Sequence, residues 1–91
     1  MNERLHLVLS GRVQGVCFRM YGCDEARRLG VTGWIRNRYD GTVEVLVEGD
    51  SAAVRKFRRW CGHGPPHAIV REVQETAEAA SGEFGDFQIV Y

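Results

Sequence analysis

The sequence predicts an α+β fold in which two helices cover one face of a mostly antiparallel sheet. Leu5, Leu7 and Leu9 share one face of the first strand-like run, which is the period of a half-buried strand. Two helix-like stretches follow, and between them lie two β-rich runs joined by Asp40-Gly41, a typical hairpin turn. Helices inserted among strands in this way favour a two-layer sandwich.

The first half of the chain divides into a strand, a helix and a hairpin. The first strand covers residues 5–12. The helix covers residues 20–29, with basic residues in its last turn and Gly30 as its stop. Two strands, at residues 31–37 and 42–48, complete the hairpin.

The second half adds a helix and further strands. Asp50 or Ser51 should cap a helix that runs to about Cys61. Its apolar residues recur at helical spacing and should be buried: Val54, Phe57 and Cys61. Residues 68–73 form a fourth strand, residues 76–85 a polar loop, and a short last strand holds three alternating residues, namely Phe87, Ile89 and Tyr91. The order βαββαβ, plus a short C-terminal strand, predicts the ferredoxin-like split βαβ sandwich.

Composition excludes several classes of protein. The 91 residues suit a single domain, residues 1–91, with one small core, and the 12 basic and 12 acidic residues cancel. Zero net charge argues against nucleic acid or an anionic membrane as the main partner. No run approaches the roughly 20 apolar residues of a membrane span, and the first residues lack the apolar core of a signal peptide. We therefore expect a cytoplasmic protein.

The segment from Gly11 to Arg19 is the strongest candidate for a functional site. It joins a strand to a helix, and its two glycines permit a tight turn. Consecutive N–H groups in such a turn can bind an anion, and Arg19 would add a fork of donors matched to phosphate oxygens. An ordinary connection with an exposed arginine is the alternative. The segment matches neither known nucleotide-binding glycine pattern, so a cradle here should hold a small phosphate.

The three cysteines, Cys17, Cys23 and Cys61, are a poor disulfide framework and a poor zinc site. Cys17 lies inside the loop and could in principle be a nucleophile. However, Arg19 follows it by only two positions, which is too close for the thiolate loops that bind phosphate. Packed or partly exposed thiols are the simpler interpretation at all three positions.

Asn37 is the second candidate. Alternation places it at the end of a row with Val31, Gly33 and Ile35 that otherwise faces the core. A buried amide needs hydrogen-bond partners. Its side chain could cap the turn at residues 39–41 instead of acting in catalysis, and position alone leaves both interpretations open.

Two segments together resemble the signatures of the acylphosphatase family. The first is Leu9-x-Gly11-x-Val13-Gln14-Gly15-Val16-x-Phe18-Arg19. The second is Gly33-Trp34-Ile35-Arg36-Asn37-x-x-x-Gly41-Thr42-Val43, with Gly49 further on. The stretches Gly64-Pro65-Pro66-x-Ala68-x-Val70 and Phe87-x-Ile89 are also similar, so the resemblance covers nearly the whole chain. Ile35 departs slightly from the smaller residue often found there, which affects packing more than chemistry.

The resemblance implies an acylphosphate phosphohydrolase, which hydrolyses the carboxyl-phosphate anhydride of an acyl phosphate to a carboxylate and inorganic phosphate. It places the phosphate-binding arginine at Arg19 and the residue that positions the attacking water at Asn37. The cradle of N–H groups falls on the loop residues Gln14, Gly15, Val16, Cys17 and Phe18. It also implies no metal, no cofactor and no covalent intermediate.

The carboxylate leaving group explains why so few catalytic residues would be enough. A carboxylate, whose parent acid has a pKa of about 4, departs without protonation. A phosphate monoester would need a general acid that neither segment supplies. We therefore expect selectivity for anhydrides over esters, with the water's proton passing to a phosphate oxygen of the substrate.

Two other functions are possible on the same fold. Four basic residues gather on the second helix, Arg55, Lys56, Arg58 and Arg59, and could contact RNA, although a solvated helix face is the simpler interpretation. RNA-binding modules stack bases on aromatic residues of central strands. The corresponding positions here are His6, Val8, Glu44 and Leu46. The second possibility is a non-enzymatic anion-binding domain, against which Arg19 and Asn37 both argue. We expect a monomer that binds no nucleic acid and no membrane.

Overall fold

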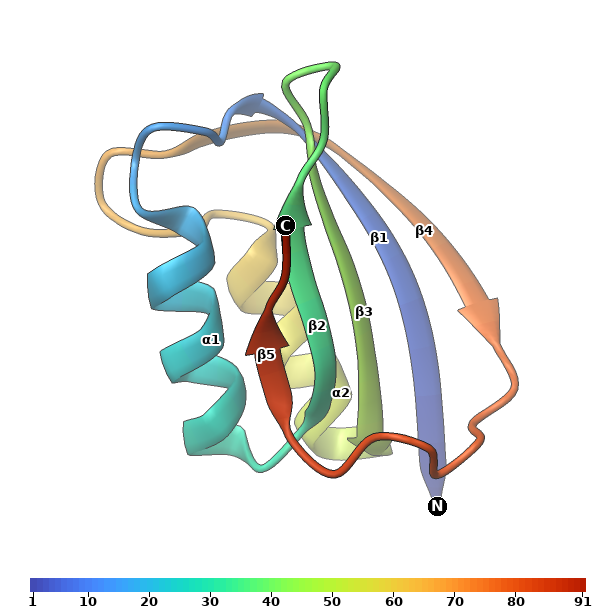
Figure 1. Ribbon diagram of the computed structural model, residues 1–91. Helices are drawn as coiled ribbons and strands as arrows, with labels where there is room; N and C mark the ends of the chain where they lie inside the picture. Colours follow the sequence, from blue (N-terminus) through green and yellow to red (C-terminus); the bar gives the residue numbers. More distant parts are fainter.

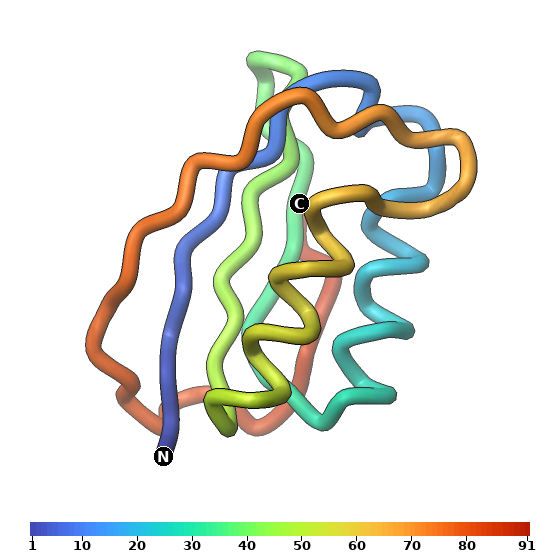
Figure 2. The backbone as a smooth tube through the Cα atoms, turned by 180° about the vertical axis from the view of Figure 1, so that it is seen from behind, coloured from blue at the N-terminus to red at the C-terminus, as the bar shows by residue number.

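The computed structural model describes residues 1–91 and contains one five-stranded sheet and two helices. Both helices pack on the same face of the sheet, and the other face, the open face, carries no helix (Figures 1 and 2). The elements in chain order are β1 (Asn2–Arg12), α1 (Phe18–Leu29), β2 (Thr32–Asn37), β3 (Val43–Asp50), α2 (Ser51–Cys61), β4 (Ile69–Glu78) and β5 (Phe87–Ile89). The predicted ferredoxin-like α+β class is confirmed.

The sheet has the strand order β4-β1-β3-β2-β5. β1 lies between β4 and β3 and pairs antiparallel with both, and β2 pairs antiparallel with β3. Only β5 runs parallel to its neighbour, β2. As a result, the β1–α1 loop, the β2–β3 turn and the last residue of the chain gather toward one end of the sheet (Figure 1).

Five predicted boundaries were wrong by two residues or more. β1 begins at Asn2 instead of residue 5, and β3 ends at Asp50 instead of residue 48. β4 continues to Glu78, so residues 76–78 are strand and not loop. Residues 76–78 are exposed on both faces of the strand, so they lack the apolar alternation by which a strand is predicted. They are extended because Thr76 pairs with His6 and Glu78 pairs with Arg4. β5 ends at Ile89, which leaves Tyr91 outside the strand. α1 begins earlier than predicted, at Phe18.

The predicted caps and turn are present. The Asp50 side chain accepts a hydrogen bond from the Ala52 N–H at 3.2 Å and caps α2. Gly30 ends α1 in the left-handed conformation, with φ of 76°. In the β2–β3 turn, Asp40 Oδ1 accepts hydrogen bonds from the backbone N–H and the hydroxyl of Thr42. Asp40 therefore caps this turn, which the sequence had left open as a role for Asn37.

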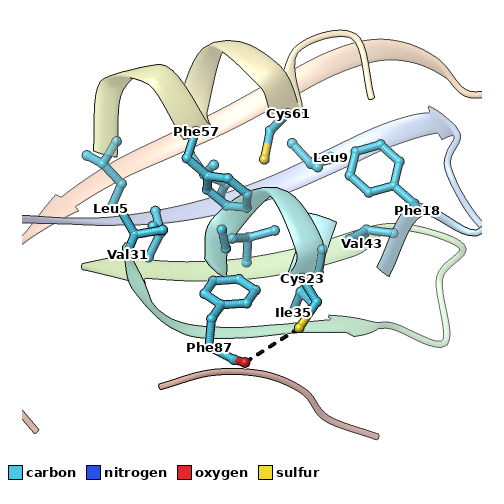
Figure 3. Close-up of a cluster of buried hydrophobic side chains, with 14 of the residues drawn as sticks. Leu5, Leu9, Phe18, Cys23, Val31, Ile35, Val43, Phe57, Cys61 and Phe87 are labelled. Carbon is cyan, nitrogen blue, oxygen red and sulfur yellow. Dashed lines mark hydrogen bonds between the residues drawn. The ribbon is translucent and has the colours of Figure 1, made fainter. Parts of the chain in front are cut away.

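The core lies between the helices and the sheet (Figure 3). Phe57 of α2 meets Phe87 of β5 edge to face, with ring centroids 5.4 Å apart. The buried stripe predicted for α2 is confirmed, since Val54, Phe57 and Cys61 are all buried. Burial raises the pKa of the Cys61 thiol and also that of Cys23, whose Sγ lies 3.5 Å from the Phe87 carbonyl oxygen. Both thiols are therefore packing groups.

The carboxylate of Glu44, on β3, bridges the neighbouring strands β1 and β2 on the open face of the sheet. One carboxylate oxygen lies 2.6 Å from Nε2 of His6, and the other accepts a hydrogen bond of 2.6 Å from Nε of Arg36. Burial would raise the pKa of the Glu44 carboxyl, but these two partners outweigh it and hold the pKa below its ordinary value. The charged carboxylate is therefore favoured by the folded state.

We predict that Glu44→Gln lowers the free energy of unfolding by about 1–3 kcal/mol at pH 7, because it removes a charged acceptor with two partners. A lowered carboxyl pKa contributes stability that is present above the unfolded pKa, about 4.3, and is lost as the pH falls through the folded value. Denaturant unfolding from pH 7 to pH 3 should show the wild type and the variant converging at low pH. Glu72→Gln, at an exposed position on β4, is the control. A gap of constant size down to pH 3 would contradict this account.

Candidate active site

The loop between β1 and α1 is held at both ends by buried apolar side chains. Val13 is 1% exposed and Phe18 is 2% exposed. Between them the backbone turns through two left-handed residues, Gly15 with φ of 74° and Cys17 with φ of 62°. Alternation of right- and left-handed residues is the conformation that points successive N–H groups into one concavity. Only Cys17 adopts this conformation without being glycine, so it is a strained position.

The N–H groups of this loop have no acceptor within the protein. None of the residues from Gln14 to Cys17 donates a backbone hydrogen bond, either to a carbonyl outside the regular elements or to a side chain. The loop then leads directly into α1, whose first N–H groups carry favourable partial positive charge. Four consecutive unpaired donors beside a helix N-terminus form a site ready to accept an anion.

The side chain of Gln14 is not free for a ligand. Its Nε2 donates to the carbonyl oxygens of Arg38, at 2.8 Å, and Thr42, at 2.9 Å. These carbonyls flank the β2–β3 turn. The amide therefore ties the loop to the hairpin that carries Asn37, and only the backbone of Gln14 remains for binding an anion.

Arg19, in the first turn of α1, has no carboxylate within ion-pair distance. Its guanidinium carbon lies 5.1 Å from the centroid of the Tyr91 ring. A cation over an aromatic face is oriented without being neutralised. The guanidinium thus keeps its donors available for an incoming anion.

Two adjoining cavities meet at Arg19, Asn37 and Tyr91, which line both. The smaller cavity is lined by the loop residues Gln14, Gly15, Cys17 and Phe18. The larger, about 750 Å³, opens between Arg19 and the β2–β3 turn. Every predicted site residue except Val16 lines one of them, and the Val16 side chain packs against the core.

Asn37 is the last residue of β2 and is paired with Val43 of β3. Its side chain makes no hydrogen bond to the protein. Asn37 thus faces the cavities with a free carbonyl and a free amide.

Sequence reasoning missed five of the residues that line the larger cavity, namely Arg36, Arg38, Tyr39, Asp40 and Tyr91. The alternation at the end of the chain suggests only a strand position for Tyr91. Arg36 and Arg38 flank Asn37 in the chain, and this adjacency was the only signal that could have suggested them.

Other candidate groups lie elsewhere. On α2, Arg55 pairs with Glu3 and Arg58 with Glu75, so this basic face is partly balanced by acidic residues. His63 contacts the carbonyl oxygen of Gly64. No group of three or more His, Cys, Asp or Glu side chains is arranged to hold a metal ion. No helix is long and apolar enough to cross a membrane.

Comparison with known proteins agrees with the predicted resemblance. The family described as Acylphosphatase matches residues 5–89. The chain belongs to the acylphosphatase family. An acylphosphatase of Pelotomaculum thermopropionicum is 54% identical over 88 residues, covering 97% of this chain and 96% of that protein. One from an Anaeromyxobacter species is 52% identical over 86 residues, covering 94% and 92%. The crystal structure of acylphosphatase from Bacillus subtilis is similar with a TM-score of 0.93 and 35% identity over the whole of both chains. The predicted family and its acylphosphatase activity are thus confirmed.

We predict that Gln14→Ala lowers the free energy of unfolding by about 1–3 kcal/mol, because two carbonyls lose their donor. It should also lower kcat for acyl phosphate hydrolysis, because the loop and Asn37 lose their common tie. Thr32→Val, which removes the hydrogen bond from Thr32 Oγ1 to the Glu48 carbonyl at the start of β2, is the control. It should lose stability but retain kcat. Equal kcat values for the two variants would show that the Gln14 amide has no special part in ordering the site.

Proposed function

We propose that residues 1–91 act as one acylphosphatase-like domain in which water attacks the phosphorus of an acyl phosphate directly. The loop N–H groups and Arg19 bind the phosphoryl group, and Asn37 positions the water. The observation that carries this proposal is the run of unpaired N–H groups from Gln14 to Cys17 beside an arginine without a carboxylate partner. The products are a carboxylate and inorganic phosphate.

The loop and Arg19 would stabilise charge on the transferred group. Phosphoryl transfer asks a protein mainly for positioning and for compensation of the charge on the equatorial oxygens. N–H groups held in a fixed turn need no reorganisation when that charge develops. The guanidinium of Arg19 adds two parallel donors to the same oxygens. No covalent step on Cys17 is part of this mechanism.

Asn37 would hold the nucleophilic water through its free carbonyl and amide. It cannot accept the proton of that water at neutral pH. We propose that the proton passes to an oxygen of the phosphoryl group itself. The carboxylate leaves unprotonated because the pKa of its acid is about 4, so the site needs no general acid, no metal and no cofactor. The same reasoning predicts poor hydrolysis of phosphate monoesters.

We also propose a monomer in the cytoplasm that binds no nucleic acid. The three cysteines are free, which suits a reducing compartment. The exposed edge strand β4 carries Glu72, Glu75 and Glu78, and charges on an edge discourage pairing with a second sheet. On the open face, β1 and β3 offer no aromatic platform for bases, since their side chains there are those of His6, Val8, Glu44 and Leu46.

We predict that Arg19→Gln lowers kcat/KM for benzoyl phosphate by about 10³-fold or more, the scale of losing an arginine that stabilises phosphoryl transfer. Inhibition by inorganic phosphate should weaken in parallel. Hydrolysis is measured in excess EDTA, in which the wild type should keep its activity. Arg59→Gln, at an exposed site on α2, is the matched control. Retained activity with unchanged phosphate inhibition in Arg19→Gln would refute the cradle, and loss of wild-type activity in EDTA would refute the metal-free mechanism.

We predict that Asn37→Ala lowers kcat by about 10²–10³, the scale of losing one positioned polar group. The inhibition constant for inorganic phosphate should change little, because phosphate is held by the loop and Arg19. Steady-state kinetics with benzoyl phosphate and phosphate as inhibitor separate the two effects. If phosphate inhibition is lost while kcat is kept, Asn37 shapes the loop and does not position the water.

A further inference from the structure

The larger cavity carries an excess of positive charge outside the phosphate cradle. Its charged side chains are Arg19, Arg36, Arg38 and Asp40, which gives three positive charges against one negative. A cleft lined by one sign of charge concentrates its field and attracts ligands of the opposite sign. The proposed mechanism uses only Arg19, so the other two arginines have no role in the chemistry.

Arg36 is already partly neutralised. Its Nε donates to Glu44 at 2.6 Å, and its guanidinium carbon lies 5.9 Å from the centroid of the Trp34 ring. These contacts hold it against the open face of the sheet. Its charge is therefore largely balanced by a carboxylate that also contacts His6.

Arg38 differs, because its backbone is fixed but its charge is not paired closely. Its carbonyl accepts from Gln14 at 2.8 Å and its N–H donates to the Thr42 carbonyl at 2.9 Å. The guanidinium makes only a 4.0 Å contact with Asp40, whose other oxygen accepts two hydrogen bonds from Thr42. The Arg38 side chain is 38% exposed. A cation thus lines the larger cavity with its donors free.

We infer that Arg38 is a specificity-determining residue that favours acyl phosphates whose acyl group carries a further negative charge. The inference rests on the proposed function, since it concerns the approach of the substrate to the same site. The attraction needs no particular pose of the acyl group, because charges act over a Debye length of about 8–10 Å at physiological salt. Arg38 thus acts on association, so it should change kcat/KM more than kcat.

The test compares benzoyl phosphate with 4-carboxybenzoyl phosphate, two substrates that differ by one carboxylate on the side of the ring away from the reacting bond. The wild type should show a higher kcat/KM for the carboxylated substrate at low salt. In Arg38→Gln the kcat/KM for 4-carboxybenzoyl phosphate divided by that for benzoyl phosphate should fall about three- to tenfold. In the wild type the ratio should also fall toward that of the variant near 1 M salt, where the Debye length is about 3 Å.

Arg59→Gln is again the matched control, since it removes one positive charge on α2 outside either cavity. Its ratio should equal that of the wild type. An unchanged ratio in Arg38→Gln, or an equal fall in Arg59→Gln, would overturn the inference while leaving the proposed function intact. Failure of the wild type to hydrolyse either substrate would instead overturn the proposed function, and this inference with it.

Discussion

The side-chain amide of Gln14 joins the two halves of the site. Its two donors reach the carbonyls of Arg38 and Thr42, on either side of the β2–β3 turn. The β1–α1 loop follows β1, whereas Asn37 ends β2, and these strands are separated in the sheet by β3. Without a direct hydrogen bond between them, the relative position of the loop and Asn37 would depend on the flexing of three strands. In the proposed mechanism, this one side chain thus sets the geometry between the loop that would bind the phosphoryl group and Asn37, which would position the water.

Unpaired donors in the loop have a cost in stability, which the surrounding packing offsets. Val13 and Phe18 bury the two ends of the loop, and Phe18 meets Trp60 edge to face at 5.3 Å. A Cβ on Gly64, in the turn after α2, would lie 2.4 Å from the Phe18 ring. This position must therefore be glycine for the Phe18 ring to pack where it does. Rigid anchoring of this kind keeps the N–H groups preorganised for an anion instead of turning inward to find carbonyls.

Most of the fold could be predicted because local signals agree with it. The alternation in β1, the Asp50 cap and the Asp40-Gly41 turn each act over a few residues, and each is found where predicted. The errors fall where a distant partner decides the outcome. Residues 76–78 are strand only because β1 pairs with them, and Tyr91 leaves the strand to lie under Arg19. The site residues could be assigned by resemblance, but neither the two bonds of Gln14 nor the loosely paired charge of Arg38 has a signature along the chain.

The position of β1 in the sheet has a consequence for how the protein folds. Leu9 pairs with Val43 on one side and with Val73 on the other, so the strand that leads into the β1–α1 loop is fixed by segments far along the chain. The entropy of closing these long loops opposes folding before the contacts that stabilise them have formed. A nascent or refolding chain therefore has no site until most of its length is in place.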